Sequence, residues 1–307
     1  MRKIKRSLVI TSLFPKTLVS FDELKDTVLF LAGSNNQVKQ GCFQQLEFYH
    51  PPGRDEEIAK LFKDAHMESI FIAVPELKGA NLSLCSLDEN ERIMAVNTLK
   101  TCMDRAIITG SHSIMFNSGS VFPDSMITKA MPSPEQIKNS CTAYLRSLEE
   151  IGNYREKQGY TLSLLLEPGD KNIHYFQLLG DTDLVVKTCR EISIPGYSLT
   201  MDIAHTRLNN EDVISSLGKT LPWCNHIHLC NCVIDNPMDP FFGDYHVDFD
   251  FPGASWTYAD FADIFEKIKN LYTERDFTIS LEISCRAEYN KAWFNNVISK
   301  CPWFFTD

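Results

Sequence analysis

The sequence of 307 residues has no long hydrophobic run, no cysteines spaced as CxxC and no basic stripe beyond residues 1–6. No run approaches the roughly 20 apolar residues of a membrane helix, so we expect no membrane partner. The ten cysteines are scattered, several of them within apolar runs, as reduced core residues are, and we expect a cytoplasmic protein. The formal charge of −10, from 40 acidic and 30 basic residues, repels phosphate backbones, so nucleic acid is a disfavoured partner.

The chain also has no segment that would divide it into separate domains. No linker rich in Gly, Pro or Ser interrupts it, and neither a repeat nor a low-complexity tract is present. The basic start precedes a short apolar stretch that ends at Pro15 and lacks a small-residue cleavage site. We therefore interpret the start as a basic tail before a first strand, and residues 1–307 as a single domain.

Short apolar runs alternate with longer amphipathic segments along the whole chain, which is typical of repeated βα units around a parallel sheet. Apolar residues make up 44% and charged residues 23% of the chain, enough to bury a substantial core. A barrel of eight such units typically needs about 250 residues, so the pattern predicts one (β/α)₈ barrel, a TIM barrel, of the α/β class. The predicted strands are residues 8–13, 43–48, 69–74, 113–116, 161–167, 197–202, 226–230 and 278–282. Helical spacing is found in residues 22–31, 55–65, 87–109, 133–157, 183–191, 210–217 and 258–271.

The longest irregular segment, residues 233–256, follows the seventh predicted strand and contains several Pro and Gly residues. In a barrel this position lies at the C-terminal mouth, where the working loops are found. A loop of this length in a compact domain is usually functional. We expect it to cover a site with His246; its alternative role is contact between subunits, which would make the protein a homo-oligomer.

Four predicted strands end in a side chain that can bind a metal: Glu167, Asp202, His228 and Glu282. Because successive side chains of a strand point to opposite faces, His226 and His228 share the inward face, and we assign His226 to packing inside the barrel. Three carboxylates gathered at one apolar mouth would repel one another and shift their pKa values. A divalent cation between them resolves this conflict, so the sequence predicts a metal site at the ends of strands five to eight.

These strand ends resemble the motifs of the xylose-isomerase-like barrel superfamily. Members of that superfamily include ketohexose 3-epimerases, hydroxypyruvate isomerases, inosose dehydratases and endonuclease IV. The resemblance implies that Glu167, Asp202, His228 and Glu282 hold the metal, and that His205 contacts substrate or, in the nuclease, a further metal. The matching motifs are Leu166-Glu167-Pro168, Met201-Asp202-Ile203-Ala204-His205, His226-Ile227-His228-Leu229 and Ser280-Leu281-Glu282-Ile283.

The sequence departs from the superfamily pattern at three points. Cys230-Asn231 stands where members often have Asp-Asn, and the glycine-rich turn expected in the following loop is altered at residues 246–253. The Glu-Pro motif continues as residues 169–172, Gly-Asp-Lys-Asn, where epimerases commonly have Asn-Arg. These differences leave the metal site intact and bear on the identity of the substrate.

The resemblance implies an isomerase or epimerase of a small sugar that moves a proton through a metal-stabilised enediolate. Three carboxylates and an imidazole suit Mn²⁺, Mg²⁺ or Co²⁺, with Zn²⁺ as an alternative. The metal would polarise the substrate carbonyl, and Glu167 and Glu282 would be the acid/base pair. The expected substrate contacts are His205, Lys171, His246 and Arg286, the last of them for a phosphate or carboxylate group.

Three alternatives remain open. An endonuclease IV-like phosphodiesterase would use Asp244 and His246, with His205, as a second metal site. Against it, the third and fourth strands end at Val74-Pro75 and Phe116-Asn117, without the His that those nucleases supply there. A lyase similar to inosose dehydratase, or a barrel that only binds a ligand, would keep the same fold.

Overall fold

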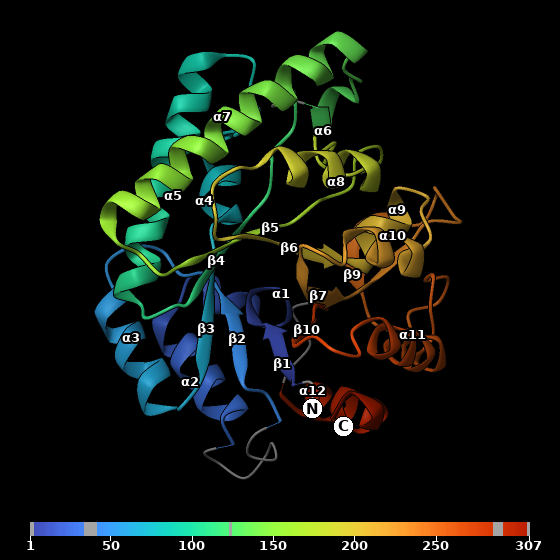
Figure 1. Cartoon of the computed structure of the whole chain (residues 1–307). Helices are drawn as coiled ribbons and strands as arrows, with labels where there is room; N and C mark the ends of the chain where they lie inside the picture. Colours follow the sequence, from blue (N-terminus) through green and yellow to red (C-terminus); the bar gives the residue numbers. More distant parts are fainter. Residues whose placement is uncertain (1–2, 34–41, 123–124, 285–290, 306–307) are drawn as a thin grey trace.

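Eight parallel strands close into a barrel in the computed structural model of the chain, which describes residues 3–33, 42–122, 125–284 and 291–305 (Figure 1). Each strand pairs with its neighbours in sequence, and the last pairs with the first, which confirms the predicted (β/α)₈ barrel. Around the barrel the strands are β1 (Ile4–Val9), β10 (Phe277–Leu281), β7 (Cys224–Leu229), β6 (Tyr197–Asp202), β5 (Ser163–Leu166), β4 (Ser113–Phe116), β3 (Glu68–Ile72) and β2 (Gln45–Phe48).

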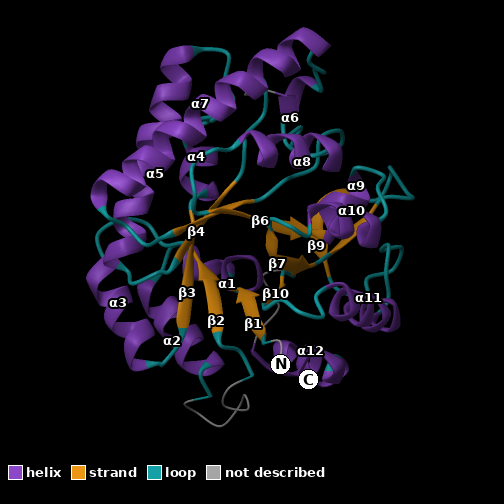
Figure 2. Ribbon diagram, in the orientation of Figure 1, coloured by secondary structure: helices purple, strands orange, loops and turns teal. Residues whose placement is uncertain are grey.

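The helices lie outside the strands and cover the barrel (Figure 2). Local sequence explains their ends: Ser133 and Gln136 form a capping box before the longest helix, and Gly159 ends it with φ +69°. The longer helices are α2 (Phe21–Leu31), α3 (Asp55–Asp64), α5 (Glu89–Ile108), α7 (Pro134–Gln158), α8 (Thr182–Glu191), α10 (Val213–Thr220), α11 (Tyr258–Leu271) and α12 (Lys291–Lys300). The short ones are α1 (Ile10–Leu13), η1 (Pro15–Leu18), α4 (Val74–Gly79), α6 (Ser125–Thr128), α9 (Ile203–Leu208) and η2 (Pro302–Phe305). Among the described residues no helix is both long and apolar enough to cross a membrane.

The first strand differs from the prediction. It spans Ile4–Val9, and the apolar residues after it form α1 instead of continuing the strand to residue 13. Lys5 and Arg6 belong to this strand, and neighbouring elements provide their partners. The Lys5 ammonium lies 2.5 Å from a carboxylate oxygen of Glu68, and the Arg6 guanidinium donates to the carbonyl of Phe304 at 2.5 Å. The interpretation of these residues as a tail was therefore wrong.

The long segment after the seventh barrel strand is more regular than expected. β8 (Asn231–Val233) and β9 (Gly243–Val247) pair antiparallel within it. Gly243 has φ +104°, a conformation that glycine adopts without strain, at the start of β9. The pair returns the chain to the barrel mouth, where the backbone N–H of Ser284 donates to the carbonyl of His246 at 2.7 Å.

The interior of the barrel is apolar on one side and polar on the other. A small cluster of Val9, Ile70, Ile72, Met115 and Leu165 lies apart from the main core, which packs between the strands and helices. On the other side, buried polar side chains face the interior from β1, β2, β6, β7 and β10. They are Ser7, Gln45, Glu47, Thr200, His226, His228 and Ser280, all at most 3% exposed. The polar side underlies the ends of β6, β7 and β10, where Asp202, His228 and Glu282 lie.

A buried arginine connects the elements that surround β3 at the barrel mouth. Arg105 of α5 donates to Asp55 at the start of α3, to Glu76 of α4 and to the carbonyl of His50. Its side chain is 7% exposed. This network sets the position of α4, which extends from β3 over the barrel mouth.

Replacing Arg105 by Met should destabilise the protein, because Asp55 and Glu76 would lose the cation that balances their charge. We expect the free energy of unfolding, measured by chemical denaturation, to fall by about 3 kcal/mol. Arg146→Met is the matched control, since Arg146 pairs with Glu89 at the surface, where water screens the interaction. Equal losses in the two variants would contradict this account of the buried network.

Candidate functional site

Four side chains from four neighbouring strands meet at the C-terminal mouth of the barrel. Candidate ligand atoms of Glu167, Asp202, His228 and Glu282 all lie within 4.8 Å of one another. The strand register explains the meeting, because His228 pairs with Asp202 on one side and with Ser280 on the other. The Nδ1 atom of His228 lies 3.0 Å from Glu167 Oε1, 2.7 Å from Glu282 Oε2 and 3.8 Å from Asp202 Oδ2.

The atoms at the centre of this cluster lack hydrogen bonds. His228 Nδ1 and Glu282 Oε2 are both buried, and neither has a hydrogen-bond partner with acceptable geometry despite their close approach. Buried polar atoms are nearly always satisfied in proteins, so such a group needs an explanation. Three carboxylates converging on one ring nitrogen make an oxygen-rich donor set of the kind that divalent cations take. The residues present therefore fit a metal ion.

The electrostatics of the cluster show the same conflict of charges. Burial disfavours the imidazolium of His228, but Glu47 and Glu282 hold its pKa well above the ordinary value. Burial likewise opposes ionisation of Glu282, yet His246 and His228 hold the pKa of this carboxyl well below its usual range. Without a cation, the carboxylates are thus balanced by protonated histidines.

Asp202 is held from two sides. It is the N-cap of α9, and its Oδ1 accepts a hydrogen bond of 2.8 Å from the backbone N–H of His205. The thiol of Cys230 donates to its Oδ2 at 2.8 Å. Cys230, at the position where the superfamily pattern often has Asp, thus places a neutral donor beside the cluster.

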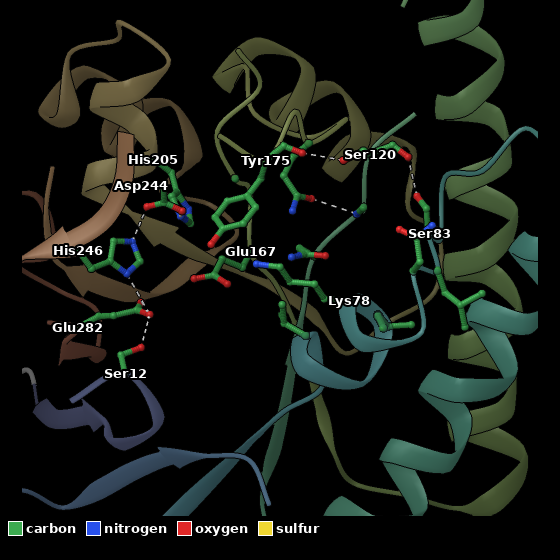
Figure 3. Close-up of a pocket in the computed structure, with 18 of the residues that line it drawn as sticks. Ser12, Lys78, Ser83, Ser120, Glu167, Tyr175, His205, Asp244, His246 and Glu282 are labelled. Carbon is green, nitrogen blue, oxygen red and sulfur yellow. Dashed lines mark hydrogen bonds and ion pairs between the residues drawn. The ribbon is translucent and has the colours of Figure 1, made fainter. Parts of the chain in front are cut away.

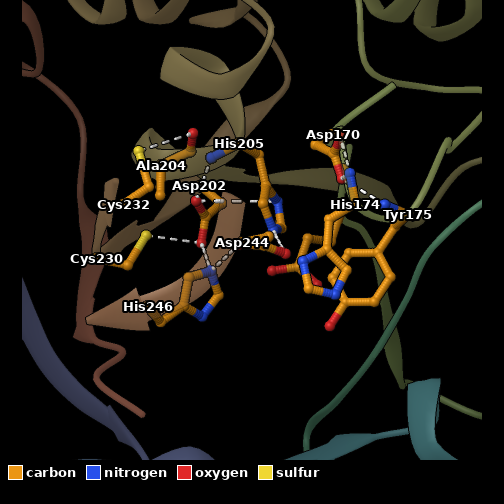
Figure 4. Close-up of polar contacts among 12 residues, drawn as sticks. Asp170, His174, Tyr175, Asp202, Ala204, His205, Cys230, Cys232, Asp244 and His246 are labelled. Atoms are coloured by element: carbon orange, nitrogen blue, oxygen red, sulfur yellow. Dashed lines mark hydrogen bonds and ion pairs between the residues drawn. The ribbon is translucent and has the colours of Figure 1, made fainter. Parts of the chain in front are cut away.

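A second group of side chains adjoins the first (Figure 4). Asp244 lies between two imidazoles, with Oδ2 at 3.0 Å from His205 Nε2 and Oδ1 at 2.8 Å from His246 Nε2. His205 Nδ1 also lies 2.9 Å from the carbonyl of Pro168. Neither Asp244 Oδ1 nor His246 Nε2 has a hydrogen-bond partner of acceptable geometry. The structure thus brings these three residues of the second candidate site together.

His246 joins the two groups. Its Nδ1 lies 3.2 Å from Glu282 Oε1, and its Nε2 lies 3.6 Å from Asp202 Oδ2. It adopts φ +43°, which is uncommon for a residue with a side chain and is found where function or packing over-determines the backbone. Burial disfavours its charged form, but Asp244 and Glu282 hold its pKa well above the ordinary value.

A cavity of about 270 Å³ opens over the candidate ligands (Figure 3). Glu167, Glu282, His205, Asp244 and His246 are among the residues that line it. Hydroxyl and amide groups line much of the remainder, among them Ser12, Asn81, Ser83, Asn117, Ser120, Gln177 and Ser284. Ser12 donates a hydrogen bond of 3.0 Å to Glu282 Oε1. This lining offers many neutral donors and acceptors, as hydroxyl-rich ligands require.

Lys78 and Tyr175 also line this cavity and were not predicted from the sequence. Lys78 extends from α4 and its ammonium lies 4.1 Å from the centre of the Tyr175 ring. Burial lowers the pKa of Lys78 and raises that of Tyr175. Among the described residues, Lys78 is the one Lys or Arg that lines the cavity. The third predicted strand was taken to run to Val74, so the short helix that carries Lys78 was not recognised.

The loop after β5 has a different role from the one expected. The carboxylate of Asp170 accepts backbone N–H groups of the following residues, up to Tyr175 at 2.6 Å, and so fixes this loop. Lys171 is not among the residues that line the cavity, and its ammonium pairs with Asp181 at 2.8 Å. The structure therefore does not bring Lys171 to the substrate cavity as predicted. Arg286, the other predicted contact, lies outside the described residues.

Comparisons with known proteins agree with the barrel fold. Residues 38–297 match the family described as the xylose isomerase-like TIM barrel. No curated protein matches the chain by sequence.

Among solved structures, the fold is similar to that of 3-keto-D-glucoside 4-epimerase from E. coli, with a TM-score of 0.69 and 14% identity over 98% of this chain and 99% of that one. D-Psicose 3-epimerase from Clostridium cellulolyticum H10 gives 0.68 and 10% identity over 99% and 100% of the chains. An AP endonuclease of family 2 from Brucella melitensis gives 0.63 and 14% identity over 96% and 99%. At these identities the likeness to the solved structures concerns the fold alone. The family match over residues 38–297 shows that the chain belongs to the xylose isomerase-like TIM barrel family.

Proposed function

We propose that the protein is a divalent-metal-dependent isomerase or epimerase of a small sugar or sugar derivative. One observation carries the proposal: Glu167 and Glu282 both line the cavity, and both have an oxygen within 3.0 Å of the same ring nitrogen of His228. Two carboxylates that share one metal and one cavity can act on the same substrate carbon. The sugar epimerases among the structures of similar fold support this proposal.

Glu167, Asp202, His228 and Glu282 would hold the cation. Their oxygen-rich donor set favours Mn²⁺, Mg²⁺ or Co²⁺, with Zn²⁺ as an alternative. When bound, such an ion supplies Lewis-acid polarisation of a substrate carbonyl, which makes the neighbouring C–H group more acidic.

The protein's own groups would then move and hold the proton. Glu167 comes from the end of β5 and Glu282 from the end of β10, with β6 and β7 between them, so the two carboxylates reach the cavity from different sides. One would remove the carbon-bound proton while the other returns one, as a general base and acid do. Ser12, which donates to Glu282, orients this carboxylate. His205 and His246 would donate to hydroxyl or carbonyl oxygens of the substrate.

Glu167→Gln and Glu282→Gln should each lower turnover by about 100-fold or more, because an amide cannot accept the proton. The measurement is exchange of substrate hydrogen with deuterated water across ketoses, their phosphates and inososes. With inososes, the loss of water from the substrate is measured as well, because it would indicate a dehydratase. Metal content must be measured in each variant, since both residues also bind the ion.

Glu91→Gln is the control for these two substitutions. Glu91 is a half-buried carboxylate of α5 that accepts from Ser86, away from the cavity. It should retain full exchange. Unimpaired exchange in the metal-loaded Glu167→Gln and Glu282→Gln variants would contradict the proposed acid/base roles.

Binding of the metal should release protons. In the absence of an ion, neighbouring carboxylates raise the pKa of His228, so this ligand carries a proton that the cation must displace. Affinity for Mn²⁺ should therefore fall as the pH is lowered and rise as the pH increases toward the raised pKa. Calorimetry in two buffers of different ionisation enthalpy should give different heats. Identical heats would contradict the prediction, and Asp202→Asn should weaken binding strongly at every pH.

The second candidate function is an endonuclease IV-like phosphodiesterase. The assembly of His205, Asp244 and His246 beside the first cluster favours it, because these residues offer a second metal site. The residues after β3 and β4 do not support this function. Val74 and Asn117 line the cavity there, and neither supplies the imidazole that a further metal would need.

Metal stoichiometry separates these functions. If the isomerase proposal is right, we expect a single Mn²⁺ per chain, retained in Asp244→Asn because Asp244 is not among the four ligands. Two or three ions per chain, together with cleavage of abasic DNA, would transfer the assignment to the nuclease. Absence of any bound ion would leave only a ligand-binding barrel.

A further inference from the structure

A fully buried carboxylate lies inside the barrel next to the candidate metal centre. Glu47 of β2 is 0% exposed and takes no part in the chemistry proposed above. Its Oε2 lies 2.9 Å from Nε2 of His228, the imidazole of the candidate ligand set. Its Oε1 lies 3.0 Å from Nε2 of His226 and accepts from the hydroxyl of Ser7 at 2.8 Å.

These contacts determine where the proton of His228 sits. An ionised carboxylate can only accept hydrogen bonds, so the nitrogen that faces it must carry a hydrogen. Both oxygens of Glu47 are in acceptor positions: Oε1 accepts from the hydroxyl of Ser7, and each oxygen lies within 3.0 Å of the Nε2 atom of one imidazole. Nε2 of His228 is thus the donor, and the lone pair of the neutral imidazole belongs to Nδ1. This is the atom that faces Glu167, Asp202 and Glu282.

We propose that Glu47 is a positioning residue that fixes the proton of His228 on Nε2 and directs Nδ1 toward the metal. This inference rests on the proposed function, because it requires a cation bound by His228. Carboxylates that accept the second N–H of a metal-bound histidine orient the ring and make the ligand nitrogen more basic. His226 is the counterpart on the other oxygen of Glu47, which gives it a role beyond the packing we had assigned to it.

Both oxygens of Glu47 are needed for this arrangement. Each accepts from one imidazole, so an amide in the same place would have one acceptor for two N–H donors. Its NH₂ group would face one of the imidazoles and repel the proton there. In Glu47→Gln one of the two imidazoles would have to turn or change tautomer, although the side chain keeps its size, and the paired arrangement that directs His228 would be lost.

The test compares Glu47→Gln with Thr200→Val by competition of Mn²⁺ with a chelator. Thr200 lies in the same polar interior, is 0% exposed, pairs with His226 in the strand register and has a hydroxyl without a hydrogen-bond partner. Its replacement by Val should leave Mn²⁺ affinity unchanged. Glu47→Gln should lower the affinity by about 10- to 100-fold, the usual effect of losing such a partner. Equal affinities in Glu47→Gln and the wild type would overturn the inference.

A second measurement uses the unmodified protein, so it does not depend on the folding of a variant. Nitrogen-15 NMR of the Mg²⁺-loaded wild type should show His228 with hydrogen on Nε2 and a ligated Nδ1. Hydrogen on Nδ1 would overturn the inference even if Glu47→Gln failed to fold. Failure of the wild type to bind Mn²⁺ and Mg²⁺ would instead refute the proposed function, so the two failures are distinguishable.

Discussion

The site depends on the balance of negative charge around His228. Three carboxylates face its Nδ1 atom, while Glu47 faces Nε2, and all of these groups are removed from bulk water or nearly so. Buried like charges cannot remain close together without compensation. In this structure the compensation comes from imidazoles, and a divalent cation would provide it in a form that also does chemistry. The contacts of Glu282 with the imidazoles of His228 and His246 are part of this balance of charge.

The split interior of the barrel makes this arrangement possible. On the side of β3, β4 and β5, apolar side chains fill the interior together with Val9 at the end of β1 and supply packing. On the side of β1, β2, β6, β7 and β10, buried polar groups support the histidines from within the barrel. Such groups are costly to bury unless they are paired, and Glu47 pairs with two imidazoles and a hydroxyl. Part of the barrel interior is thus polar, and its hydrogen bonds orient side chains at the strand ends.

Much of the fold and of the central cluster followed from local pattern. Strand alternation put His228 and Glu282 on the inward face, and the sequence ranges of β4 and β6 agree with the prediction to the residue. The predicted bounds of the first strand were wrong because the apolar run of residues 8–13 continues from β1 into α1. Hydrophobicity alone does not distinguish a buried strand from a short buried helix. The pairing of Lys171 with Asp181 could not be predicted from the sequence, because the hydrogen bonds of Asp170 that fix this loop have no periodic signature.

The sequence by itself determined which residues stand at the strand ends, since parallel strands in a closed barrel present their carboxyl ends at one mouth. Glu167, Asp202, His228 and Glu282 needed no knowledge of packing to be brought together. The tertiary structure alone decided the groups that act across the barrel. Glu47 meets His228 through the closure of the sheet, and Lys78 meets Tyr175 because Arg105 and Asp170 fix two unrelated loops. These pairs are separated by long stretches of chain, and contact between them follows from three-dimensional closure, which no local periodicity encodes.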